Sequence, residues 1–169
     1  MYPSEIISKL EFNKDVFKSL FHGLSKEELV WKPQPDKWCL LEILCHLYDE
    51  EREDFRARLK YTLEMPEQPM PKIDPQGWVA ERKYMEKNFA EMLSDFIAER
   101  DQSVNWLKSL STPQWKNIYR HPQAGELSAE MFLSNWLAHD YLHFRQITYT
   151  KYQYLISHFN TRYDYAGNW

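Results

Sequence analysis

Hydrophobic residues recur at spacings of three and four along most of the chain, which is the pattern of helices buried on one face. The pattern predicts helices from Ser4 to Phe21, from Trp38 or Cys39 to Leu63, from Trp78 to Leu110, and from a cap at Ser128 to Ile147. A capping-box spacing at residues 25–28 predicts one further short helical turn. Arg100 falls near the buried face of the third helix, where it either pairs with a carboxylate or extends its charge to solvent.

Four amphipathic helices indicate an all-α protein, folded as a four-helix bundle, because each helix has one apolar face that must be covered. The chain has 169 residues, which suits one domain with a sizeable core, and we expect a single domain over residues 1–169. Connectors are expected at the proline-rich residues 65–77 and at residues 111–127. The aromatic tail that follows Ile156 and ends at Trp169 is expected to pack back on the bundle or on another subunit.

Composition and charge exclude several classes of function. The net charge is −4 and the isoelectric point is near 5.9, so the chain lacks the basic balance that nucleic-acid binding requires. No apolar run approaches the roughly 18 residues of a membrane span, and no signal peptide is evident. The only cysteines, Cys39 and Cys45, lie on one predicted helix and are poorly placed for a disulfide. We therefore expect a cytoplasmic protein that binds neither nucleic acid nor membranes.

The candidate chemistry begins with His139 and His143 on the fourth predicted helix. Residues four apart lie on one face of a helix, with Cβ atoms about 5–6 Å apart, so two such imidazoles can bind one metal ion. A third ligand must come from the histidines at positions 22, 46, 121 and 158 or from a carboxylate. His46 is the best placed, because it lies inside a long helix beside the apolar stripe. Three imidazoles that leave a position open are typical of catalytic metal sites.

The histidine pair also has alternative interpretations. Two histidines at this spacing occur as ordinary core or surface residues, and the bundle would then be an interaction scaffold without a metal. The segment from His139 to His143 resembles the H-E-x-x-H helix of metalloproteases, with Asp140 in place of the glutamate. The aspartate is one methylene shorter and no third ligand follows at the expected spacing, which disfavours a protease.

Two segments, DKWCLLEILCHLYDE at 36–50 and AHDYLHFRQI at 138–147, together resemble the DinB/YfiT-like superfamily. The first matches its K-W-S … H-L-x-D/E-x-E helix and the second its H-D-x-x-H-x-x-Q-I helix. HPQAG at 121–125 resembles the H-P-x-x-G stretch before its last helix. Cys39 departs from the pattern, which usually has Ser or Thr as the helix cap. The resemblance implies a bundle with an up-down-down-up course and three metal ligands, which fall on His46, His139 and His143.

The resemblance also implies a function. Members bind a divalent ion, zinc or nickel above all, act on small molecules and are often homodimers. They include thiol-S-transferases and isomerases that use low-molecular-weight thiols, and proteins described as metal-dependent hydrolases. We expect an enzyme that activates such a thiol or water for attack on a small electrophile; the alternative is a non-catalytic metal-binding or stress-response module. Glu50 and Asp140 are the candidate catalytic carboxylates, and Gln146 is a candidate hydrogen-bond partner of a metal-bound imidazole.

Overall fold

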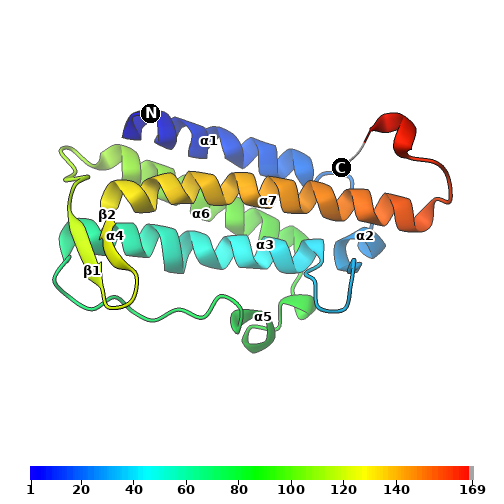
Figure 1. Cartoon of the computed structure of the whole chain (residues 1–169), viewed down its shortest axis with the longest axis horizontal. Helices are drawn as coiled ribbons and strands as arrows, with labels where there is room; N and C mark the ends of the chain where they lie inside the picture. Colours follow the sequence, from blue (N-terminus) through cyan, green and yellow to red (C-terminus); the bar gives the residue numbers. More distant parts are fainter. Residues whose placement is uncertain (168–169) are drawn as a thin grey trace.

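The computed structural model describes residues 1–167, and long helices form its body. These are α1 (Pro3–Leu20), α3 (Leu40–Asp49), α4 (Ala57–Glu64), α6 (Phe89–Ser109) and α7 (Ala129–His158). The segment η1 (Glu50–Arg56) joins α3 to α4, so the three make one continuous helical rod. In Figure 1, α1 and α7 run in one direction while α3–α4 and α6 run in the other. The predicted all-α four-helix bundle with an up-down-down-up course is confirmed.

The connector from residue 65 to residue 77 makes this course possible. Two helices that follow each other in the same direction need a connection that returns along their whole length, and in Figure 1 the connector runs back beside α3 and α4. It then enters the short helix α5 (Trp78–Glu81) and the single turn η2 (Tyr84–Glu86) before α6 begins.

The predicted third helix is continuous only from Phe89, because between Trp78 and Asn88 the chain forms α5 and η2 with a break between them. Lys83 has a φ of 51°, in the left-handed region, and this breaks the helical path after α5. Asn88 then starts α6 afresh, because its side-chain oxygen accepts hydrogen bonds from the backbone N–H groups of Ala90 and Glu91 at 2.9 and 3.2 Å. The apolar spacing runs on through this break, so periodicity alone could not detect it.

The second predicted helix is confirmed as the α3–η1–α4 rod. Its cap residue is Cys39, whose backbone N–H donates to the Glu42 carboxylate at 2.9 Å. The Glu42 side chain thus satisfies a backbone N–H that the helix itself leaves unpaired.

Cys39 and Cys45 are free and buried, and they lie against η2. The Cys39 sulfur is 3.4 Å from the Met85 sulfur, and the Cys45 sulfur is 3.9 Å from the Tyr84 carbonyl oxygen. Burial raises the pKa of these thiols to about 11 and about 12, respectively.

A buried ionic cluster crosses the middle of the bundle. Arg100, on α6, donates from Nε to the Glu51 carboxylate at 2.9 Å and from both Nη atoms to the Asp140 carboxylate at 2.8 Å. Asn13 donates at 2.9 Å to Asp140 Oδ2, the oxygen that also accepts from Nη1 of the arginine. The Trp136 indole N–H donates to Glu51 at 2.9 Å. Burial disfavours the guanidinium charge, but the two carboxylates outweigh it and raise the pKa of Arg100. Arg100 is thus the buried partner of carboxylates, and the cluster ties α1, η1, α6 and α7 together.

Apolar side chains fill the bundle on either side of this cluster. Toward the N-terminal end of α7, the fully buried side chains include Leu10, Leu59, Leu133 and Trp136. Toward the other end they include Phe17, Phe96, Ile43, Leu44 and Ile147. Both groups contain side chains from α1, from the α3–η1–α4 rod, from α6 and from α7. Each helix is therefore packed against its neighbours along its length.

Between α6 and α7 the chain forms a small antiparallel hairpin that the sequence patterns did not predict. Strand β1 (Ile118–His121) pairs with β2 (Gly125–Ser128), with His121 opposite Gly125. The His121 ring closes the turn, because its Nδ1 accepts from the backbone N–H groups of Gln123 and Ala124 at 3.1 and 3.0 Å. The predicted short turn at 25–28 is confirmed as the start of α2 (Lys26–Val30), capped by Ser25.

The last helix is longer than predicted, since α7 continues eleven residues beyond Ile147 to His158. A single turn, η3 (Asp164–Ala166), follows it. In the tail, Phe159 is 64% and Tyr165 99% exposed, so these two side chains do not pack on the bundle, and packing on another subunit stays a prediction. Trp169 lies outside the described residues. None of the helices within residues 1–167 has the length and apolarity needed to cross a bilayer.

Candidate metal centre

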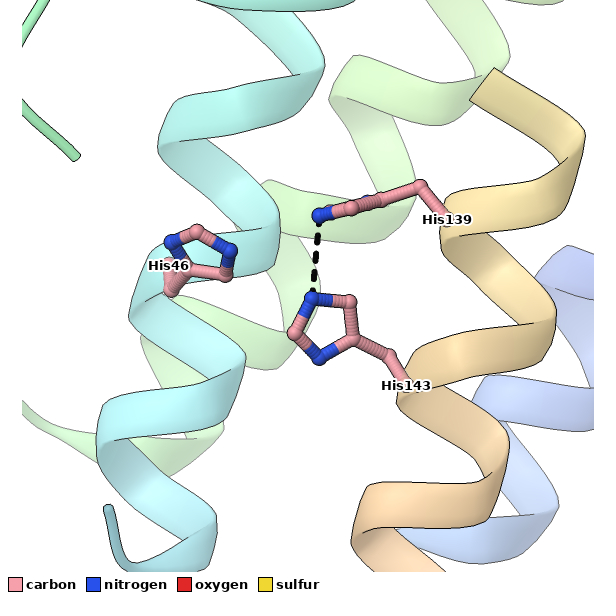
Figure 2. A group of neighbouring side chains, drawn as sticks. All are labelled: His46, His139 and His143. Carbon is pink, nitrogen blue, oxygen red and sulfur yellow. Dashed lines mark hydrogen bonds between the residues drawn. The ribbon is translucent and has the colours of Figure 1, made fainter. Parts of the chain in front are cut away.

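Three histidines from two helices converge between α3 and α7. His139 and His143 project from α7 toward α3, and His46 projects from α3 toward them (Figure 2). The Nε2 atoms of His139 and His143 are 3.0 Å apart, and the His46 ring centroid is 5.5 and 5.0 Å from the centroids of the other two rings. One ring nitrogen from each residue lies within 4.8 Å of the others. The structure thus brings together the three predicted ligands.

Burial keeps these imidazoles uncharged. It is the main cause that lowers the pKa of His46 to about 3, of His139 to about 2 and of His143 to about 4. Neighbouring imidazoles lower the pKa of His46 and His139 further, while the Gln146 side chain and the Asp140 carboxylate act in the opposite direction on His143. The neutral form is the one that binds a metal ion, so the site holds its ligands ready at neutral pH.

The donor set fits a divalent ion. Two nitrogen ligands of one tetrahedral zinc ion stand about 3.4 Å apart when each bond is about 2.0–2.1 Å, so the 3.0 Å pair is already close to that separation. The third nitrogen lies within 4.8 Å of the other two, at most about 1.4 Å more than the tetrahedral separation, and a small movement of its side chain would close that difference. The Nδ1 atoms of His46 and His143 are buried without a hydrogen-bond partner within residues 1–167. Orphaned polar atoms of this kind are costly in a core and point to a functional site.

Aromatic side chains enclose the three rings on two sides. The Phe55 ring lies 4.8 Å from the His139 ring and stacks on Trp136 at 5.9 Å, so it covers the site toward the N-terminal end of α7. The Trp38 ring lies 4.7 Å from the His46 ring. Neither Phe55 nor Trp38 was a predicted site residue, because each sits on the helical apolar pattern or in a connector, and only the tertiary fold brings it to the histidines.

Glu50 follows His46 by four residues and is also buried, with 5% of its surface exposed. Burial is the main cause that raises the pKa of its carboxyl group to about 9, and the nearby Asp54 carboxylate adds to the effect. One of its oxygens has no hydrogen-bond partner within residues 1–167. A carboxyl group that keeps its proton at neutral pH can donate it, so Glu50 has the property of a general acid.

Asp140 is next to His139 in sequence, but its carboxylate is engaged on both oxygens by Arg100 and Asn13. Its predicted catalytic role stays a prediction, whereas its structural role in the ionic cluster is plain. Asn13 was missed, although a signal was present: it stands between Leu10 and Phe17 at helical spacing, as a polar residue within the buried stripe of α1.

The other three histidines lie outside the centre. His22 is exposed just after α1, His121 closes the hairpin turn, and His158 stacks on Tyr154 with ring centroids 4.0 Å apart. Within residues 1–167, the three histidines of the centre are the one group of at least three potential ligands that converge on a point.

Comparisons with known proteins agree with this geometry. The model of the DinB superfamily matches residues 9–147, which include all three histidines. The fold is similar to that of YfiT from Bacillus subtilis, a solved structure described as a probable metal-dependent hydrolase with an unusual four-helix bundle topology. The TM-score is 0.79 at 18% sequence identity, over 89% of this chain and 86% of that one. No curated protein matches the chain significantly. Since the family model spans most of the sequence, the chain belongs to the DinB superfamily.

Proposed function

We propose that this protein is a metal-dependent enzyme that activates water or a low-molecular-weight thiol for attack on a small electrophilic molecule. The observation that carries the proposal is the set of three buried, uncharged imidazoles, His46, His139 and His143, whose nitrogens face one point. Three protein ligands leave at least one position open on a divalent ion, as in catalytic sites and unlike closed structural ones.

The residues around the histidines have distinct roles in this proposal. A bound zinc or nickel ion supplies Lewis-acid chemistry, which makes a water or thiol acidic enough to react at neutral pH. Phe55 and Trp38 exclude water from two sides of the three rings. Gln146 stands beside His143 and orients its ring, and Glu50 holds the proton that a leaving group needs.

The proposal is tested first by the metal content of the native protein. Elemental analysis of protein purified without an affinity tag is expected to give about one divalent ion per chain, and His143→Ala is expected to lose it. His22→Ala is the matched control, because it removes an exposed histidine far from the centre in sequence. A wild-type protein that remains metal-free after incubation with zinc and with nickel would refute the proposal.

Turnover is tested next on the metal-loaded protein. Hydrolysis of activated esters and amides is compared with transfer of glutathione, bacillithiol or mycothiol to an electrophilic acceptor such as a chloroarene. Activity that depends on the ion and disappears in His143→Ala supports an enzyme, and its substrate preference separates a hydrolase from a thiol transferase. Stoichiometric metal without turnover of any of these substrates would favour a non-catalytic metal-binding module instead.

A further inference from the structure

A cavity of about 230 Å³ is lined by two residues that neighbour the histidines of the metal centre. Two of its lining residues are Trp38, whose ring lies 4.7 Å from the His46 ring, and Gln146, which follows His143 by three residues on α7 and so lies next to it on the helix surface. Phe55 and Trp136 cover the opposite side, toward the start of α7. The cavity therefore lies on the side of the centre away from Phe55 and Trp136, toward the end of α7, and Trp38 is in its wall.

The cavity is formed by two segments far apart in sequence. The connector between α2 and α3 contributes Gln34, Lys37 and Trp38, while α7 contributes Gln146 and Gln153, which are seven residues apart and so lie on one face two turns along the helix. The three carboxamides offer both hydrogen-bond donors and acceptors, Lys37 offers a cation that pairs with Asp36 at 3.0 Å, and Trp38 offers a flat apolar face. None of the lining residues is acidic.

A larger cavity, which Lys37 and Trp38 also line, differs in its charged residues and in the helices that form it. It measures about 520 Å³ and has carboxylates of Asp36, Glu42 and Glu86 in its wall, but it contains no residue of α7. It therefore shares only Trp38 with the surroundings of the centre, and its three carboxylates are balanced by Lys32, Lys37 and Lys83, which also line it and pair with them. Of these two cavities, the smaller one alone is lined by residues of α7, the helix that carries His139 and His143.

We propose that the cavity lined by Trp38, Gln146 and Gln153 is the substrate pocket of the metal centre, and that it binds the amide or carboxylate end of a small neutral or singly anionic molecule. Its volume lies below the roughly 300 Å³ at which pockets for whole drug-sized ligands begin, so it takes one end of the substrate while the reactive end reaches the histidines. This inference rests on the proposed function, and it adds the class of substrate and the residues that recognise it.

Three acetylated probes of nearly equal size test the charge preference. N-acetylglycine is an anion, N-acetylglycinamide is neutral and N-(2-aminoethyl)acetamide is a cation. In ¹⁵N-labelled, zinc-loaded protein, the first two are expected to shift the side-chain signals of Gln146, Gln153 and the Trp38 indole, and the cation is expected to bind much more weakly. Replacing zinc by cobalt is expected to speed the relaxation of the bound probe's protons, because the pocket adjoins the centre.

Variants of Gln153 provide the controls, since this residue is almost three turns beyond His143. Gln153→Ala is expected to weaken the neutral probe about three- to tenfold, the value of one lost hydrogen bond. Gln153→Glu is expected to weaken the anionic probe more than the neutral one. Gln123→Ala, in the exposed hairpin turn, is expected to leave both probes unaffected.

The outcomes separate this inference from the proposed function. Stoichiometric zinc with probe shifts that avoid these residues, or with no probe binding, would overturn the pocket and leave the metal centre intact. Probe binding at Gln153 in a protein that takes up no zinc or cobalt would refute the proposed function, and with it the assignment of the pocket to a metal centre. Preferred binding of the cationic probe would overturn the substrate class.

Discussion

Replacing Asp140 by asparagine tests how much the buried ionic cluster contributes to the fold. Asp140 is completely buried and accepts three hydrogen bonds, two from Arg100 at 2.8 Å and one from Asn13 at 2.9 Å. An asparagine keeps the shape but turns one acceptor oxygen into an NH₂ group that faces a donor. It also removes half of the negative charge that balances the guanidinium, since Glu51 is the other carboxylate.

The size of the effect follows from burial. Removing one partner of a buried ion pair costs about 3–5 kcal/mol, and because Glu51 stays bonded to Arg100 we expect the lower end, about 3 kcal/mol. For a chain of 169 residues, 1 kcal/mol corresponds to roughly 2–4 °C in the melting temperature. The expected fall in the melting temperature of Asp140→Asn is therefore about 6–12 °C.

The measurement is thermal unfolding followed by circular dichroism, with a chelator in every sample so that metal binding does not add to stability. Glu11→Gln is the matched control, because it makes the same change of carboxylate to amide in an exposed ion pair, that of Lys108 with Glu11 at 2.7 Å. The control is expected to change the free energy of unfolding by about 0.5 kcal/mol or less. The reasoning is refuted if Asp140→Asn and Glu11→Gln unfold at the same temperature.

For three other changes, the structure determines whether the folded protein becomes more or less stable. Glu50→Gln is expected to stabilise the protein relative to the wild type, and increasingly so from pH 5 to pH 8, in urea unfolding. The folded carboxyl group has a pKa of about 9, so folding of the wild type requires uptake of a proton that the unfolded chain has released at these pH values. A difference in the free energy of unfolding that does not change with pH would contradict this. The metal-free wild type is expected to lose stability as the pH falls below about 6.5, because the histidines of the unfolded chain bind protons there while the three buried imidazoles of the folded protein stay neutral. His143→Ala is expected to lose less stability over the same pH range, and an equal loss would be evidence against neutral burial. Zinc at about 100 times its dissociation constant is expected to stabilise the wild type by about 2.7 kcal/mol, or about 5–11 °C, and to leave His46→Ala unchanged in a melting scan.

Local sequence patterns were sufficient to predict the main helices and the spacing of His139 and His143. Periodicity predicts which face is buried, and a pair four residues apart on one helix needs no tertiary information to lie side by side. His46 could be chosen as third ligand because it flanks the apolar stripe of its own helix. Its convergence with the other two histidines, however, depends on how α3 packs against α7.

The features that sequence patterns missed are those that depend on distant partners or on single backbone groups. The partners of Arg100 come from η1 and α7, 49 and 40 residues away, and no local pattern encodes such a pairing. The new start of α6 depends on one side-chain cap at Asn88, inside an apolar pattern that continues through it. The hairpin has four-residue strands, too short for a clear alternation of apolar and polar positions.

The burial of Cys39 and Cys45 beside η2 bears on how reactions of this protein are followed. A thiol whose pKa is near 11 or 12 is almost entirely protonated at neutral pH, and only the thiolate is a nucleophile. Disappearance of an alkylating or disulfide-forming reagent can then be attributed to an added co-substrate, even when the protein is present in large amounts. Reducing agents, which compete for zinc, can be left out of purification buffers without the sample forming cross-linked species.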